Sequence, residues 1–206
     1  MADYKKPDYW QLKARKEGYP ARSVYKLKEI DEKFNLFKTS FFRVLDIGAA
    51  PGSWSLYVLR KIYAGSGAGL KNSFLVAADL SALSHNELFE KENFFFIQGD
   101  VTTADIRETL LSKGPYSVII SDAAPNTTGN HMMDSARSLD LAETVLSYAE
   151  CALAFGGNLA LKVFQGSGVD ALLKRMKTYF KTVKSFKPQA CRGDSVETYF
   201  VGLGKK

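Results

Sequence analysis

The sequence has little cysteine and no long apolar run. Its 206 residues contain two cysteines, Cys151 and Cys191, which are too few and too far apart for a disulfide framework or a zinc cluster. We interpret Cys151 as a reduced core thiol and Cys191 as a loop thiol. No apolar run approaches the roughly 20 residues that span a bilayer, and the first residues lack an apolar signal core. We therefore expect a cytoplasmic protein with no membrane segment.

Charge is distributed unevenly along the chain, whose formal net charge is +6. Residues 1–38 contain 10 Lys and Arg against 6 Asp and Glu, and residues 174–206 contain 9 against 2. Residues 39–173 contain 9 against 14, so the two ends are basic and the middle is acidic. If the ends meet on one face, they form a surface for a polyanion. The alternative is that these lysines only solubilise exposed helices.

The order of apolar segments predicts a single domain over residues 1–206, with a basic helical extension (1–38) and a core (39–206). Strands are predicted over 43–47, 74–78, 94–97, 116–120, 157–164, 182–187 and 195–202, and helices over 7–17, 23–34, 53–62, 103–112, 134–153 and 169–179. Alternating strands and helices indicate an α/β fold, with a mostly parallel sheet covered by helices on both faces. The last two strands have no helix between them, which predicts an antiparallel hairpin.

The glycine-rich turn after the first strand is the strongest local signal. A short apolar strand leads into small residues from Gly48 to Gly52, and Ser53 is a candidate cap for the next helix. Backbone can approach a ligand closely at such a turn, which predicts nucleotide binding. The spacing is Gly48-x-x-x-Gly52 instead of G-x-G-x-x-G, so the pyrophosphate fingerprint is incomplete and a dinucleotide is disfavoured. Packing alone is the other explanation for the turn.

Acidic residues stand at four predicted strand ends: Asp46, Asp79, Asp100 and Asp122. Ligands of parallel sheets lie beyond the carboxyl ends of the strands. Asp79 is placed to hold ribose hydroxyls, and Asp100 to accept from an adenine amino group. An acidic rim repels phosphates and favours a cationic nucleoside, of which S-adenosylmethionine is an example.

Five ordered segments carry a resemblance that covers about residues 9–205. They are residues 46–54, 98–101, 121–126, 161–166 and the region of Glu197, and residues 22–30 resemble an opening helix of the same family. Together they resemble the FtsJ/RrmJ family of ribose 2′-O-methyltransferases. The resemblance implies a Rossmann-like fold of the class I methyltransferases, with S-adenosylmethionine as cofactor and no metal. Ser53, where many members have glycine, and a longer loop at 64–72 depart from the family pattern.

The resemblance also implies site residues. A Lys-Asp-Lys-Glu tetrad falls on Lys26, Asp122, Lys162 and Glu197. Cofactor contacts fall on Gly48, Ala50, Pro51, Gly52, Trp54, Asp79, Asp100, Val101 and Asp122.

The tetrad suits transfer to a ribose 2′-hydroxyl, which is a poor nucleophile until its proton is removed. Lys162 is the expected general base. Burial and the nearby cation of Lys26 favour a neutral amine there, whereas Asp122 and Glu197 favour the ammonium. Lys26 has an alternative role in holding the target ribose or phosphate. A buried charge network without catalysis is the structural alternative.

The leading hypothesis for the substrate is a uridine in ribosomal RNA of the large subunit, acted on by a monomer. The alternatives are a tRNA anticodon loop, an RNA cap, a non-catalytic RNA-binding or assembly module, and a nicotinamide dehydrogenase. The basic residues expected around the catalytic mouth are Lys5, Lys6, Lys13, Arg15, Lys16, Arg22, Lys174, Arg175, Lys177, Lys181, Lys184 and Lys187. Their contacts would be to phosphates, which give salt-dependent affinity but little sequence preference.

Overall fold

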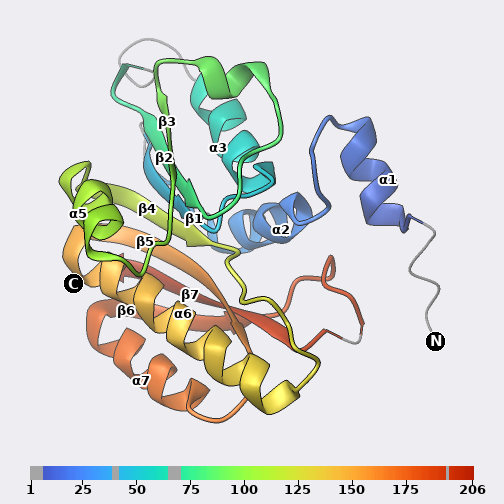
Figure 1. Cartoon of the computed structure of the whole chain (residues 1–206). Coiled ribbons are helices and arrows are strands. Elements are labelled where there is room, and N and C mark those ends of the chain that lie inside the picture. The colour runs from blue at the N-terminus through green and yellow to red at the C-terminus, as the bar shows by residue number, and fades with distance from the viewer. Residues whose placement is uncertain (1–6, 39–41, 65–70, 194) are drawn as a thin grey trace.

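A seven-stranded sheet forms the centre of the computed structural model, which describes residues 7–38, 42–64, 71–193 and 195–206 (Figure 1). Its strands are β1 (Arg43–Ile47), β2 (Phe74–Asp79), β3 (Phe94–Gln98), β4 (Tyr116–Ser121), β5 (Leu153–Phe164), β6 (Phe180–Phe186) and β7 (Glu197–Lys205). The strand order is β3-β2-β1-β4-β5-β7-β6, and β7 runs in the direction opposite to that of the other six strands. The predicted fold class, with its antiparallel C-terminal pair, is confirmed.

The helices lie on both faces of this sheet. They are α1 (Tyr9–Lys16), α2 (Val24–Phe34), α3 (Ser53–Ala64), α5 (Ala104–Ser112), α6 (His131–Ala152) and α7 (Val169–Tyr179), with a 3₁₀ turn η1 (Glu87–Glu90) that the sequence pattern did not predict. Helix α6 begins three residues earlier than predicted, because the Asn130 side chain accepts hydrogen bonds from the first-turn amides. Among the described residues, no helix is both long and apolar enough to cross a bilayer.

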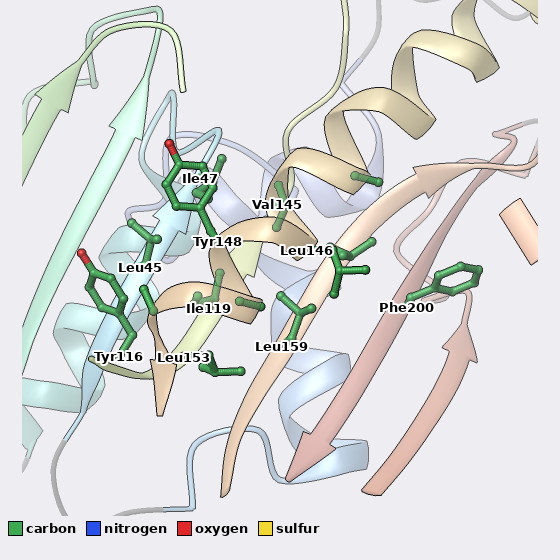
Figure 2. Packing of buried hydrophobic residues seen from close by; sticks show 14 of the residues in the cluster. Leu45, Ile47, Tyr116, Ile119, Val145, Leu146, Tyr148, Leu153, Leu159 and Phe200 are labelled. Carbon is green, nitrogen blue, oxygen red and sulfur yellow. The ribbon is translucent and has the colours of Figure 1, made fainter. Parts of the chain in front are cut away.

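Alternate residues of each strand enter two separate cores. Leu45 and Ile47 pack with Ile119, Leu159 and residues of α6, as Figure 2 shows. Val44, Val118 and Ile120 point to the other face, where α2 and α3 cover them. Strands buried on both faces are continuously apolar, which explains the short hydrophobic runs of the sequence. The same alternation places polar residues near the strand ends on one face or the other.

The described part of the N-terminal extension, residues 7–38, packs on α3 (Figure 1). Val24 and Tyr25 of α2 share a small core with Leu56 of α3. Ser23 stands at the N-cap position of α2 as predicted, but its side chain makes no cap hydrogen bond. The predicted capping role of Ser53 is wrong, because Ser53 is the first residue of α3. The Ser53 hydroxyl instead bonds both backbone groups of Ala21, at 2.7 Å to the nitrogen and 3.1 Å to the oxygen.

The predicted core position of Cys151 is also wrong, whereas Cys191 lies in a loop as predicted. Cys151 is exposed and Cys191 is buried. Cys151 lies on the outer side of α6, where the Arg107 guanidinium is 3.5 Å from its sulfur. The segment just before Cys191 is bound to α2, because the Glu29 carboxylate accepts hydrogen bonds from the amides of Gln189 and Ala190.

Candidate active site

The four predicted tetrad residues meet at the carboxyl edge of the sheet. Lys162 lies near the end of β5, and Asp122 directly follows β4. Glu197 begins β7 opposite the end of β5, and Lys26 is in the first turn of α2. Leu161 and Val163 point to the α6 face. By strand alternation Lys162 therefore points to the face covered by α2 and α3.

Two ion pairs connect the tetrad. The Lys162 Nζ lies 3.0 Å from Asp122 Oδ1 and also donates to the Asp122 carbonyl at 2.5 Å. The Lys26 Nζ donates to Glu197 Oε2 at 2.8 Å. All four side chains are largely buried, and the ion pairs offset the cost of removing their charges from water.

Tyr199 is a fifth member that the sequence analysis missed. Its hydroxyl donates to Asp122 Oδ1 at 2.6 Å, and it pairs with Lys162 in the register between β5 and β7. The Lys26 ammonium lies 5.9 Å from the centroid of its ring. Residues two apart on a strand share a face, so the spacing from Glu197 to Tyr199 is the signal that would have identified it.

Electrostatics keep Asp122 and Lys26 charged at neutral pH. Burial by itself would raise the pKa of Asp122, but Lys162, Lys26 and the Tyr199 hydrogen bond together hold that pKa below its usual value. Burial would lower the pKa of Lys26, but Asp122 and Glu197 outweigh it and raise that pKa. Burial raises the pKa of Tyr199 well above its ordinary value, so its hydroxyl remains a donor.

A cavity of about 310 Å³ opens at the carboxyl ends of β1, β2, β3 and β4. Its lining includes six of the predicted cofactor positions: Gly48, Ala50, Asp79, Asp100, Val101 and Asp122. Most of its other lining residues are small or apolar, among them Ala123, Ala124 and the exposed Leu80.

The acids of this cavity are fixed in place. Asp79 accepts hydrogen bonds from the amides of Ala50 and Ser81, at 2.9 and 2.8 Å. Asp100 Oδ1 accepts from the amide and hydroxyl of Thr102, and these bonds lower the pKa of Asp100. The cavity therefore presents acceptors, which suit the hydroxyls, amino group and positive charge of S-adenosylmethionine better than a phosphate.

Three predicted cofactor positions are not among the described residues that line this cavity: Pro51, Gly52 and Trp54. The indole of Trp54 is 2% exposed and donates to the Ser23 carbonyl at 2.8 Å. Its ring lies 5.9 Å from that of Tyr199. The side chain of Trp54 thus connects the cofactor turn to α2 and the tetrad. A side chain at Gly52 would meet Phe89, so this glycine also serves packing.

A second cavity, of about 250 Å³, lies on the other side of the tetrad and is called here the acceptor cavity. Its lining consists of Arg22, Ser23, Lys26, Arg192, Ser195 and Glu197. A third cavity, of about 330 Å³, shares Arg192 and Ser195 with it. Three basic side chains therefore surround the acceptor cavity, and Arg22 is anchored there by Asp8 and the Ala190 carbonyl.

The predicted gathering of C-terminal basic residues around the mouth is wrong for part of the set. Strand β6 runs parallel to β5, so Lys181 at its start lies at the opposite edge, over the ring of Phe155. Arg175 is paired with Glu150 of α6 at 2.8 Å. Lys187, after the end of β6, does reach the correct edge and donates to the Ser195 carbonyl. Lys5 and Lys6 lie outside the described residues.

Comparison with known proteins agrees with this geometry. Residues 19–205 match the family described as FtsJ-like methyltransferase. The chain belongs to this family. The family assignment confirms the expected methyltransferase with S-adenosylmethionine as the methyl donor. Within the described residues, no group of three or more His, Cys, Asp or Glu side chains is arranged to hold a metal ion.

Curated relatives match the FtsJ-like chain over nearly its whole length. A Treponema denticola protein named ribosomal RNA large subunit methyltransferase E is 47% identical, with 98% of this chain and 97% of the relative covered. A Borreliella afzelii protein of the same name is 44% identical, with 95% and 96% covered. A solved Plasmodium falciparum structure, assigned as a ribosomal RNA methyltransferase, aligns with TM-score 0.73 and 26% identity over 91% of this chain and 98% of its own.

Proposed function

We propose that this protein methylates a ribose 2′-hydroxyl, that of a uridine, in ribosomal RNA of the large subunit. One observation carries the proposal: the tetrad lies between two cavities. Asp122 lines the cofactor cavity, Lys26 and Glu197 line the acceptor cavity, and Lys162 contacts Asp122. The names of the curated relatives support ribosomal RNA as the substrate.

The cofactor cavity would hold S-adenosylmethionine through its acids. Asp79 would accept from the ribose hydroxyls of the cofactor, and Asp100 would accept from its adenine amino group. When bound, the cofactor would supply a methyl group bonded to a sulfonium sulfur, and that methyl carbon can be attacked from the side opposite the sulfur. The protein's share of the catalysis is then mainly the placement of the acceptor oxygen.

Lys162 is the proposed general base. In its neutral amine form, its Nζ would take the proton from the 2′-hydroxyl, so that the oxygen can bond to the methyl carbon as the carbon–sulfur bond breaks. Asp122 fixes the position of Nζ through two contacts, and Tyr199 fixes Asp122. A base held in a fixed position lowers the entropic cost of reaching the reactive geometry.

Lys26 has a different proposed role from Lys162. Burial lowers the pKa of Lys26, but Asp122 and Glu197 raise it by more, so Lys26 remains a cation. A permanent cation cannot accept the proton, but it can hold a phosphate or ribose oxygen of the RNA in the acceptor cavity. Arg22 and Arg192 line the same cavity and would share that task.

The test is methyl transfer from labelled S-adenosylmethionine to unmodified large ribosomal subunits, free ribosomal RNA and unmodified tRNA in parallel. Nucleoside analysis of the products should give a 2′-O-methylated uridine, formed mainly on the subunit, with the enzyme acting as a monomer. Label on tRNA alone would show that the substrate is tRNA, with the anticodon loop as the expected target. No label on any RNA, despite measured cofactor binding, would favour a non-catalytic module.

The role of Lys162 is tested in the same assay. Lys162→Ala should abolish transfer, while the cofactor dissociation constant stays within a few-fold, because Lys162 is not among the described residues lining the cofactor cavity. Lys174→Ala removes an exposed lysine from α7 and is the matched control. Activity that survives in Lys162→Ala would show that another group is the base.

A further inference from the structure

A cavity of about 440 Å³ lies outside both sites described above, between the turn joining α1 to α2 and the segment before η1. Neither the proposed base nor the cofactor positions line it. Its lining residues come from parts of the chain far apart in sequence, because Arg15 to Pro20 face Ser84 to Phe89 across it. We call it the turn cavity.

The turn cavity has an apolar and aromatic floor with a polar, cationic rim. Leu56 and Tyr19 are buried, and Phe89 is partly buried. Arg15 and His85 on the rim are exposed. Within the described part of the chain, Arg15 makes no ion pair, whereas His85 lies 4.0 Å from Glu90. An aromatic floor suits the face of a base, and an unpaired arginine suits a phosphate.

Further cations surround the floor. The Tyr19 ring has the Arg60 guanidinium 4.3 Å and the Lys28 ammonium 4.8 Å from its centroid. The nearby acid Glu17 is already paired with Lys28 at 2.7 Å. The local charge therefore favours an anionic ligand with a flat apolar part, which describes a nucleotide within RNA.

The turn cavity also lies close to the acceptor cavity. Pro20 lines the turn cavity and Arg22 lines the acceptor cavity. The Cα atoms of these two residues are at most about 7 Å apart, because only one residue lies between them. The Ser53 hydroxyl bonds both backbone groups of Ala21, the residue between them. The two cavities are thus held at a fixed separation on either side of one turn.

We propose that the turn cavity is a second RNA subsite, which takes the base and phosphate of a nucleotide flanking the methylated one. This inference rests on the proposed function, because it assumes that the acceptor cavity receives a nucleotide of RNA. A strand that places its target ribose at Lys26 would cross the turn at residues 20–22. Its neighbour would then place its base against Phe89, beside the cations that cover the Tyr19 ring, with its phosphate at Arg15.

The first test fills the cavity. Ser84 is exposed on the rim and its amide bonds the Pro51 carbonyl, so Ser84→Trp occupies the space without removing a core side chain. We expect the KM for unmodified large subunits to rise about tenfold, as loss of one stacked base predicts. The kcat at saturating RNA and the dissociation constant of S-adenosylmethionine should stay within about twofold, because the catalytic residues are untouched.

The second test addresses the phosphate contact. The logarithm of RNA affinity falls linearly with the logarithm of salt concentration, by about 0.7 per contact for a single strand. Arg15→Ala should reduce this slope by about that amount, and Lys174→Ala should leave it unchanged. A merely structural effect of Arg15 would change the affinity or the melting temperature without changing the slope.

A double-mutant cycle then identifies the occupant. Short unmodified ribosomal RNA fragments, each lacking the base of one nucleotide flanking the target, are compared on the wild type and on Ser84→Trp. At one flanking position the missing base should cost about tenfold on the wild type and nothing further on the variant. Additive losses at every position, or an unchanged KM for Ser84→Trp, would overturn the subsite. Failure of the wild type to methylate any RNA would overturn the proposed function instead.

Discussion

Asp46 is a fully buried acid with an incomplete set of partners. Ser55 donates to its Oδ2 at 2.7 Å, while its Oδ1 has no partner among the described residues. Burial raises the pKa of Asp46 from 3.8 to about 7. The Ser55 hydrogen bond opposes this rise, and the negative charges of Asp122 and Asp79 add to it. An acid near the ordinary ligand edge of the sheet is therefore not necessarily a ligand residue. Asp46 faces α3 rather than the cofactor cavity.

This burial predicts a pH dependence of stability. The folded pKa of Asp46, about 7, exceeds the ordinary 3.8, so the folded state retains a proton that the unfolded state releases between these values. The free energy of unfolding contributed by Asp46 therefore falls as pH rises through this window. Asp46→Asn removes that contribution. The stability of the variant minus that of the wild type should rise by a few kcal/mol between about pH 4 and 7, then level off.

Urea unfolding of both proteins across this range measures the difference. Because the pKa of Asp122 is held below 3.8, Asp122 stays ionised in the folded protein over this range and adds little pH dependence of its own. A difference that stays constant with pH would contradict the titration of Asp46. The sequence shows an acid at this position, but its burial and its missing partner depend on the packing of α3, which no local pattern reveals.

Gly48 predicts a second residue-scale effect. A Cβ there would lie 2.5 Å from the Ala123 Cα, and its φ is +76°. Gly129 has a similar φ of +83°, but a Cβ added there would have no other atom within 4 Å, so Gly129→Ala is the matched control. We expect Gly129→Ala to destabilise by about 1 kcal/mol, through φ alone. Gly48→Ala should lose about 1–3 kcal/mol more, because the backbone of the β4 turn must shift.

Thermal and urea unfolding of the two glycine variants give the comparison. Equal losses would mean that the close approach of the two turns is unimportant. The sequence predicts a tight turn at Gly48 and leaves two explanations, ligand approach and packing. The structure identifies the packing partner as the turn after β4, which is 75 residues away in the chain.

Helix α2 is the element that joins the two sides of the active site. It carries Lys26, its Glu29 binds the backbone of residues 189 and 190, and the carbonyl before it accepts from Trp54. The apolar spacing of α2 predicted the helix and its buried face correctly. These polar connections were not predictable, because each joins residues that are distant in sequence.

Trp54→Phe tests how α2 is positioned. Phenylalanine retains much of the ring packing beside Tyr199 but removes the N–H that bonds Ser23. We expect a stability loss of about 1 kcal/mol and a several-fold lower kcat/KM for RNA. The cofactor dissociation constant should change little, because the indole does not line the cofactor cavity. Trp10→Phe in α1 is the control for loss of an indole.

The opposite outcome for Trp54→Phe is equally informative. Weaker cofactor binding with unchanged RNA kinetics would make the side chain a cofactor contact, as the family resemblance alone implies. The same split between cofactor affinity and RNA kinetics distinguishes the two roles for any residue of the turn from Gly48 to Trp54. Circular dichroism of both variants ensures that the comparison is made between folded proteins.

The distribution of charge over the whole molecule separates two basic regions that are similar in sequence. Arg15 lines the turn cavity, and Lys16 follows it as the last residue of α1. Lys177 and Lys181 lie near the junction of α7 and β6, at the far edge of the sheet. Composition predicted a polyanion surface from both ends, but it could not separate them, because strand direction decides which edge a residue reaches.

Charge reversal distinguishes these regions. Arg15→Glu with Lys16→Glu should weaken binding of unmodified ribosomal RNA at least about tenfold at moderate salt, since the proposed phosphate contact of Arg15 becomes repulsive and a neighbouring positive charge becomes negative. Lys177→Glu with Lys181→Glu makes the same change in net charge at the far edge and should weaken binding less than about twofold, because exposed charges beyond a Debye length are screened. Filter binding over a range of salt measures both. Equal losses in the two double variants would mean that net charge alone attracts the RNA, and that the N-terminal face has no special part in binding it.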